Sequence, residues 1–147
     1  MTTQKSTTTL HQSGNTRPSS GGIETPIFSK TYDLLLWLSP QALKFPRNQR
    51  FAACATLLHL SQEFHKRLLQ AQRSSAPAKA LLYADVTLAQ LRLHWRLAHG
   101  WQLVSDGTFE HGVRLMDEVG RLLGAWLKNA RAAAQRTNPA HSSDSSA

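Results

Sequence analysis

Cysteine is almost absent from this sequence, since Cys54 is the one cysteine in 147 residues. An internal disulfide and a cysteine-based zinc site are therefore both excluded. No run of about 18 uncharged apolar residues is present, as a membrane-spanning helix would require. The first 22 residues are rich in Thr and Ser and lack the apolar segment of a secretory signal peptide. From these absences we expect a cytoplasmic protein.

Catalytic motifs are absent as well. The scattered glycines form no phosphate-binding loop, no Gly-x-Ser-x-Gly elbow and no Gly-x-Gly-x-x-Gly turn. His59 and His65 are six residues apart and His94 and His99 are five apart, so neither pair places two metal ligands on one helical face. Cys54 lies in an apolar run and is interpreted as a small buried hydrophobe. We therefore expect no catalytic residue, no metal and no cofactor.

Acidic residues are scarce, and this is the first positive signal. Seventeen Lys and Arg face nine Asp and Glu, which gives a net charge of +8 and a pI near 10.4. Between residues 26 and 131 the counts are fourteen and seven, so almost all of the excess charge lies on the part expected to fold. A basic folded surface indicates a phosphate-rich or otherwise acidic partner, although basic proteins without such a ligand are common.

The ends and the middle of the chain differ in composition. Residues 1–24 and 136–147 contain few large apolar side chains, so they cannot bury enough surface to offset their ordering entropy. We predict that both segments are disordered. Residues 25–135 carry apolar patterns of helical period and no sustained period of two. This predicts an all-α domain, an up-down antiparallel four-helix bundle, because long helices with short connections pack as antiparallel neighbours.

Proline, glycine and serine place the predicted helix boundaries. The first helix is expected from Thr25-Pro26 to Ser39-Pro40, the second from Phe45-Pro46 to Arg73, the third from Pro77 to Ser105-Asp106-Gly107, and the fourth from Thr108 onward. The third helix has the clearest apolar seam, at spacings of three and four: Leu81, Ala84, Leu88, Leu91, Trp95 and Ala98. Asp85 interrupts this seam and is predicted to be half-buried, paired with an arginine from another helix or subunit.

Basic residues recur along the fourth predicted helix. Arg114, Arg121 and Lys128 repeat every seven residues and form one stripe, with Arg131 just beyond. We predict that this stripe contacts nucleic acid. The alternative is a solvated helix face on which intrahelical pairs, Asp117–Arg121 and Glu118–Arg114, neutralise the charge.

Two further basic groups lie on the third and second helices. Arg92 and Arg96 are i,i+4 neighbours, a like-charge pair that costs stability unless an anion neutralises it, so we add both to the nucleic-acid-binding set. Lys44, Arg47 and Arg50 are spaced by threes at the start of the second helix, where free N–H groups also favour anions. We predict that this second cluster binds a nucleic-acid enzyme.

Five groups of residues along the chain are informative when taken together. They are Lys30–Leu38 (KTYDLLLWL), Lys44–Phe51 (KFPRNQRF), Ala84-Asp85 with Leu88, Leu91 and Arg92, Glu110-His111 with Arg114-Leu115, and Gly120–Lys128 (GRLLGAWLK). Together they resemble the Avd family, the accessory variability determinant proteins of diversity-generating retroelements. The resemblance spans residues 26–131, with the groups in order and at compatible spacing.

The resemblance implies a function and partners. Avd proteins are four-helix bundles that form a ring-shaped homopentamer with a basic surface. They associate with the reverse transcriptase of their retroelement and with its template RNA, and they support mutagenic cDNA synthesis without being polymerases or nucleases. For this chain the resemblance therefore implies a non-catalytic partner of a reverse transcriptase, of template RNA or cDNA, and of further copies of itself.

Three alternatives stay open from the sequence. One is a related four-helix protein encoded by intervening sequences of 23S rRNA genes. Another is a small ribonuclease using His111 with Lys128 or Arg114. The third is a structural oligomer without nucleic-acid contact, for which the predicted exposed residues Leu69, Leu82, Leu93 and Trp101 suggest an interface.

Overall fold

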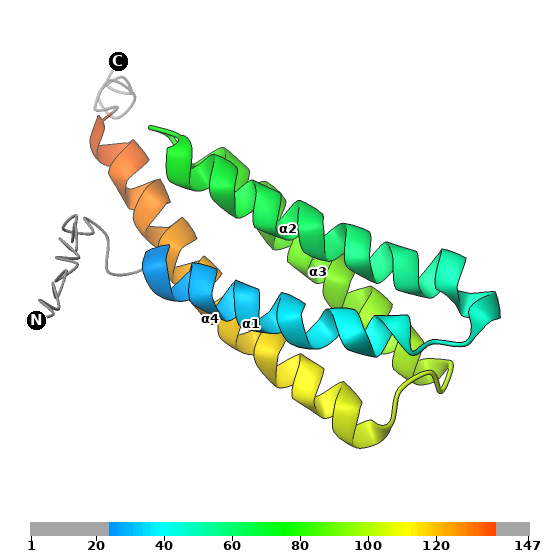
Figure 1. Cartoon of the computed structure of the whole chain (residues 1–147). Helices are drawn as coiled ribbons and strands as arrows, with labels where there is room; N and C mark the ends of the chain where they lie inside the picture. Colours follow the sequence, from blue (N-terminus) through cyan, green and yellow to red (C-terminus); the bar gives the residue numbers. More distant parts are fainter. Residues whose placement is uncertain (1–23, 138–147) are drawn as a thin grey trace, which may run out of the picture.

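Four antiparallel helices make up the structure (Figure 1). The computed structural model describes residues 24–137, without the side chains of residues 24, 25, 50 and 51. The elements are α1 (Glu24–Leu43), the 3₁₀ turn η1 (Arg47–Gln49), the π-helical segment η2 (Arg50–Cys54), α2 (Ala55–Arg73), α3 (Ala78–Gly100) and α4 (Asp106–Thr137). No strand occurs within residues 24–137. The predicted all-α, up-down four-helix bundle is confirmed.

The order of the helices around the bundle is set by their contacts. α1 packs between α2 and α4, and α3 packs between α4 and α2. α1 and α3 therefore occupy opposite corners, as do α2 and α4. The outward faces of α1 and α3 consequently point away from each other, so each is free to meet a different neighbouring molecule.

The core is built from the predicted apolar seams. Every residue of the α3 seam is buried, with at most 2% of its surface exposed. In α4 Gly112 is buried and the neighbouring Val113 is partly buried. In α2 Ser61 is buried and the neighbouring Leu60 is partly buried. Asp85 is exposed, so its predicted half-burial is wrong. The reason is helical geometry, because residue 85 lies about 100° around the helix from the inward-pointing Ala84.

The first helix continues past its predicted end. Pro40 lies inside α1, which ends at Leu43. Proline leaves the carbonyl of Leu36 without its helical donor, and Leu36 is 61% exposed, so water can reach that part of the helix. Leu38 and Ala42 are both fully buried on either side of Pro40. Their packing against the core holds the last turn in place despite the proline.

The second helix begins less regularly than predicted. After α1 the chain turns at Phe45, which is buried and donates its N–H to Ala42 O at 3.2 Å. The 3₁₀ turn and the π-helical segment follow Pro46, and regular α-helix starts only at Ala55. Ala53 and Cys54 are buried, so the π-helical segment packs against the core. The prediction that Cys54 is buried is confirmed.

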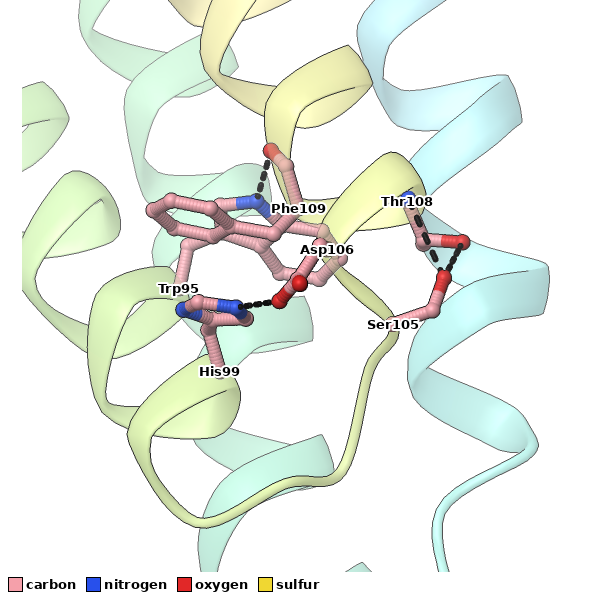
Figure 2. A network of polar contacts seen from close by, with 6 residues as sticks. All are labelled: Trp95, His99, Ser105, Asp106, Thr108 and Phe109. Carbon is pink, nitrogen blue, oxygen red and sulfur yellow. Dashed lines mark hydrogen bonds and ion pairs between the residues drawn. The ribbon is translucent and has the colours of Figure 1, made fainter.

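A compact turn joins α3 to α4 (Figure 2). Gln102 adopts a left-handed φ of 60°, and Leu103 N–H bonds Ala98 O at 2.9 Å, the hydrogen-bond pattern of a Schellman cap. Ser105 then caps α4, because its hydroxyl accepts the N–H of Thr108 at 3.2 Å. The third helix thus ends at Gly100, and Ser105 starts the fourth helix instead of ending the third.

The bundle extends slightly beyond its predicted limits of 25–135, since Glu24 and residues 136–137 are helical. The rest of the predicted disorder falls on residues 1–23 and 138–147, outside the described residues. Among the described helices, none is both long enough and apolar enough to cross a membrane.

Candidate nucleic-acid interface

An open groove runs between α3 and α4 and gathers three of the predicted basic residues. Its volume is about 840 Å³, and the residues that line it are Asp85, Leu88, Ala89, Arg92, Arg114, Asp117, Glu118, Gly120 and Arg121. Three guanidinium groups and three carboxylates share this surface. Which cations are available to a ligand therefore depends on which carboxylates they already bind.

Arg92 binds other groups of this chain. Its guanidinium binds the carboxylate of Asp117 and donates to the carbonyl oxygen of Met116 at 3.1 Å. Gly120 makes this crossing possible, because an added Cβ there would lie 2.5 Å from Nη2 of Arg92. Asp117 also neutralises the like-charge pair expected between Arg92 and Arg96. Arg92 thus links α3 to α4 through these contacts. Arg96, by contrast, is exposed.

Arg114 and Arg121 keep their charges free. Glu118 pairs with Lys30 of α1 at 3.2 Å, and Asp117 pairs with Arg92. The intrahelical pairs considered from the sequence, Asp117–Arg121 and Glu118–Arg114, are therefore wrong. Both arginines are exposed, and neither makes an ion pair within the described part of the chain. The two acids are used to hold α4 against its neighbours, which leaves the α4 cations uncompensated.

The basic stripe continues toward the C-terminal end of α4. Arg121 also borders a smaller hollow between α1 and α4 with Pro26 and Lys30, so it reaches both sides of the helix. Lys128 and Arg131 are exposed in the last third of α4. From Val119 to Thr137 the helix has no acidic residue. The structure therefore gives the predicted stripe, with its four cations, an exposed surface.

The second predicted cluster lies at the other end of the bundle. Lys44 and Arg47 are exposed between α1 and α2, and the side chain of Arg50 is outside the described atoms. The backbone there is a three-residue 3₁₀ turn followed by a π-helical segment. The expected contribution of a regular helix N-terminus is therefore absent, and the cluster would attract an acidic partner through its side-chain charges alone.

Histidine, serine and aspartate meet at the α3–α4 turn, but they do not form a catalytic triad. His99 Nε2 lies 2.7 Å from Oδ1 of Asp106, and the hydroxyl of Ser105 is hydrogen-bonded to Thr108 (Figure 2). His99 also stacks on Phe109 at 4.2 Å between ring centroids. The nucleophile and the base are thus separately engaged in capping and packing.

His111, the residue named for a ribonuclease, packs against an aromatic ring. Its centroid lies 4.7 Å from that of Trp37, and the side chain is exposed at the surface of α4. No group of three or more His, Cys, Asp or Glu side chains in the described residues could hold a metal ion.

The sequence of the bundle matches a known family of proteins. Residues 27–130 match the bAvd-like family. The chain belongs to that family. No curated protein matches this chain closely. The family match includes most of α1 and α4 and all of α2 and α3, so it covers the groove and the stripe as far as Lys128. It confirms the resemblance seen in the sequence.

Membership identifies this bAvd-like chain as an Avd-type accessory protein. For an accessory protein, the features to be explained are its binding surfaces. One such surface was missed in the sequence: a second hollow between α2 and α3 that contains Arg67 and Lys79. A signal was present, since no acidic residue occurs between Glu63 and Asp85. The two cations are twelve residues apart, and only the turn between the helices brings them together.

Proposed function

We propose that this chain is a non-catalytic accessory protein of a diversity-generating retroelement, acting in the cytoplasm. It binds the reverse transcriptase of the same element and the template RNA or cDNA through its basic surface, and so supports mutagenic cDNA synthesis. Family membership supports the accessory role. Chemistry is left to the polymerase.

The observation that carries the nucleic-acid part of this proposal is the free charge on α4. Arg114 and Arg121 lie exposed, while the two acids between them in sequence, Asp117 and Glu118, are bound by Arg92 and Lys30. A stripe of uncompensated cations releases counterions from a nucleic-acid strand when it binds phosphates. Because such contacts reach the backbone and not base edges, binding is expected to depend strongly on salt and weakly on sequence.

Binding of a labelled single-stranded RNA at several salt concentrations tests the stripe. Arg114→Ala with Arg121→Ala removes two free charges and should lower the slope of log K against log salt by about 1.4, or about 0.7 for each phosphate no longer neutralised. The matched control is Lys44→Ala with Arg47→Ala. It removes the same net charge from exposed cations at the other end of the bundle, away from the stripe. Equal slopes for the two double variants would show that net charge, and not the stripe, governs binding.

The polymerase part rests on Lys44, Arg47 and Arg50 and on the family likeness. Reversing all three to Glu should abolish co-purification with the reverse transcriptase of the same locus and its stimulation. Reversing Lys66, Arg73 and Arg136, which are exposed and belong to neither the cluster nor the stripe, changes the charge equally and serves as the control. Retained co-purification after the first reversal would eliminate this cluster as the polymerase-binding surface.

Self-association is the third part of the proposal. α1 exposes an apolar stripe at positions i, i+4 and i+11, namely Tyr32, Leu36 and Leu43, and α3 exposes Leu82, Val86 and Leu93 at the same spacing. Exposed apolar stripes of this kind mark protein interfaces. Since α1 and α3 occupy opposite corners, one stripe meeting the other joins copies head to tail, and such contacts form a ring when the rotation from copy to copy closes. The resemblance implies five copies.

The size of the assembly tests this arrangement. Leu36→Glu on α1 and Val86→Glu on α3 should each reduce the mass measured by analytical ultracentrifugation to that of a monomer. In a two-fold symmetric dimer built on α1 alone, Val86→Glu would have no effect. Such a result would exclude the head-to-tail ring.

A further inference from the structure

A second basic hollow lies at the end of the bundle where α2 ends and α3 begins, joined by residues 74–77. Its volume is about 500 Å³, and it is lined by Arg67, Gln70, Ser74, Ala76, Lys79, Ala80 and Tyr83. The lining contains two cations, an aromatic ring and two uncharged polar side chains, with no carboxylate. This composition differs from that of the α3–α4 groove, in which acids and bases alternate.

Arg67 is held in this hollow by uncharged partners. Its guanidinium carbon lies 4.9 Å from the centroid of the Tyr83 ring, and Nη1 donates to Oε1 of Gln70 at 3.2 Å. A cation over an aromatic face is fixed in position without losing its charge. Nε of Arg67 is buried and has no hydrogen-bond partner among the described atoms. Arg92, by contrast, is held by the carboxylate of Asp117 and is neutralised.

The start of α3 adds to the positive potential. The first turn of α3 contains no acidic residue, and the residue before it, Pro77, provides no side-chain cap. Lys79 lies in this turn and is exposed. The first N–H groups of the helix therefore lack the acidic or hydroxyl partner that usually satisfies them. Together with the side chain of Arg67, they make the hollow a place where negative charge is favoured.

We propose that this hollow binds a phosphate group of a nucleic-acid strand, with Arg67 and Lys79 contacting the phosphate from α2 and α3. This inference rests on the proposed nucleic-acid binding and adds a defined phosphate site to it. The hollow flanks the exposed face of α3 on the side opposite the groove with Arg114 and Arg121. Nucleic acid would accordingly contact both flanks of α3, and not the α4 stripe alone.

The first test measures binding of a 12-nucleotide single-stranded RNA without a 5′ phosphate to the full chain by fluorescence anisotropy. Arg67→Gln with Lys79→Gln should reduce the affinity at 0.1 M salt about fivefold and lower the salt slope by about 0.7, the values expected when one phosphate is no longer bound. Lys44→Gln with Arg47→Gln, at the other end of the bundle, is the matched control of equal net charge. Affinity of the first variant equal to that of the control would overturn the proposal.

A second variant keeps every charge and tests how Arg67 is positioned. Tyr83→Leu removes the ring beneath the guanidinium and should weaken RNA binding, while Tyr83→Phe, which retains the ring, should bind like the original chain. Thermal melting of each variant shows whether the fold is intact. Equal binding by Tyr83→Leu and Tyr83→Phe in folded protein would contradict the role given to the ring.

A third measurement separates this site from the proposed function. Titration with inorganic phosphate, followed by NMR, should shift the amide signals of Lys79 and Ala80 and the Nε–H signal of Arg67, whereas chloride at equal ionic strength should not. If the Arg114/Arg121 variant lost RNA binding while the Arg67/Lys79 variant kept it, the proposed function would stand and the phosphate site in the hollow would be refuted. Phosphate shifts in a protein that binds no RNA would refute the proposed function and the nucleic-acid ligand, and would assign the hollow to free phosphate compounds.

Discussion

Replacing Gly112 by alanine tests the packing of α3 against α4, on which the groove depends. An alanine Cβ at this position would lie 2.5 Å from Nε1 of Trp95 and 2.7 Å from its Cε2. Ordinary van der Waals contact begins near 3.4 Å. The ring would therefore have to retreat by about 0.9 Å, or the helices would have to separate.

Trp95 has little room to retreat. It is fully buried, its indole N–H donates to Phe109 O at 3.1 Å, and the ring packs edge-on against Trp37 at 5.7 Å (Figure 2 shows the hydrogen bond). Overpacking of this kind costs about 1–3 kcal/mol, and loss of the hydrogen bond adds about 1 kcal/mol. Alanine regains about 1 kcal/mol over glycine in a helix. The net expectation is that the free energy of unfolding falls by about 2 kcal/mol.

Gly124 provides a matched control in the same helix. Nothing lies within 4 Å of an added Cβ there, so Gly124→Ala should gain the helical preference of alanine alone, about 1 kcal/mol. Circular dichroism melts at one fixed protein concentration, because assembly makes Tm concentration-dependent, should show Gly112→Ala melting roughly 8 °C lower and Gly124→Ala roughly 4 °C higher. A Gly112→Ala variant that melts at or above the original chain would refute the reasoning.

Three further substitutions test the caps and the core, each read from urea unfolding midpoints. Gln102→Gly should stabilise the fold by about 0.5–1 kcal/mol, because residue 102 holds a φ of 60° that glycine adopts without strain; an unchanged midpoint would count against strain at this cap. Ser105→Ala should cost about 1 kcal/mol through loss of the bond to Thr108 N–H, and Ser105→Asp should restore it. Thr31→Val should stabilise by about 1 kcal/mol, since the buried Thr31 hydroxyl has no partner among the described residues, and destabilisation would reveal one.

The helices and their buried faces could be predicted because both depend on local spacing. The seam of α3 repeats at threes and fours, and the same six residues are the buried residues of that helix. The ends of the helices were harder to predict, because they depend on tertiary contacts. Pro40 is a strong local stop signal, but the fully buried Leu38 and Ala42 keep α1 helical beyond it. At Gln102 the chain uses a left-handed residue where glycine would be expected, and the nearby Gly100 is still helical, so no glycine marks the position of the cap.

The sequence predicted which basic residues line the candidate surface, but not which carboxylates they pair with. Periodicity placed Arg114 and Arg121 on one side of α4, and it also placed Asp117 and Glu118 within reach of them. It could not show that residues on α3 and α1 bind those two acids, because that depends on how the helices pack. The same limit explains why Arg67 and Lys79 were missed as a pair.

The basic residues fall into two groups, those paired with carboxylates and those that are not. This difference bears on function more than the net charge of +8 does. Lys30, Lys66 and Arg92 are paired with carboxylates, so their charges support the fold and contribute little to the field outside it. Arg114 and Arg121 are unpaired among the described residues, and Arg67 rests on the Tyr83 ring and an amide. Free cations border both flanks of α3, whose outward face between them is apolar. If that apolar face joins a second copy, each junction between copies places free cations on both of its sides, and a nucleic-acid strand crossing the junction would contact both.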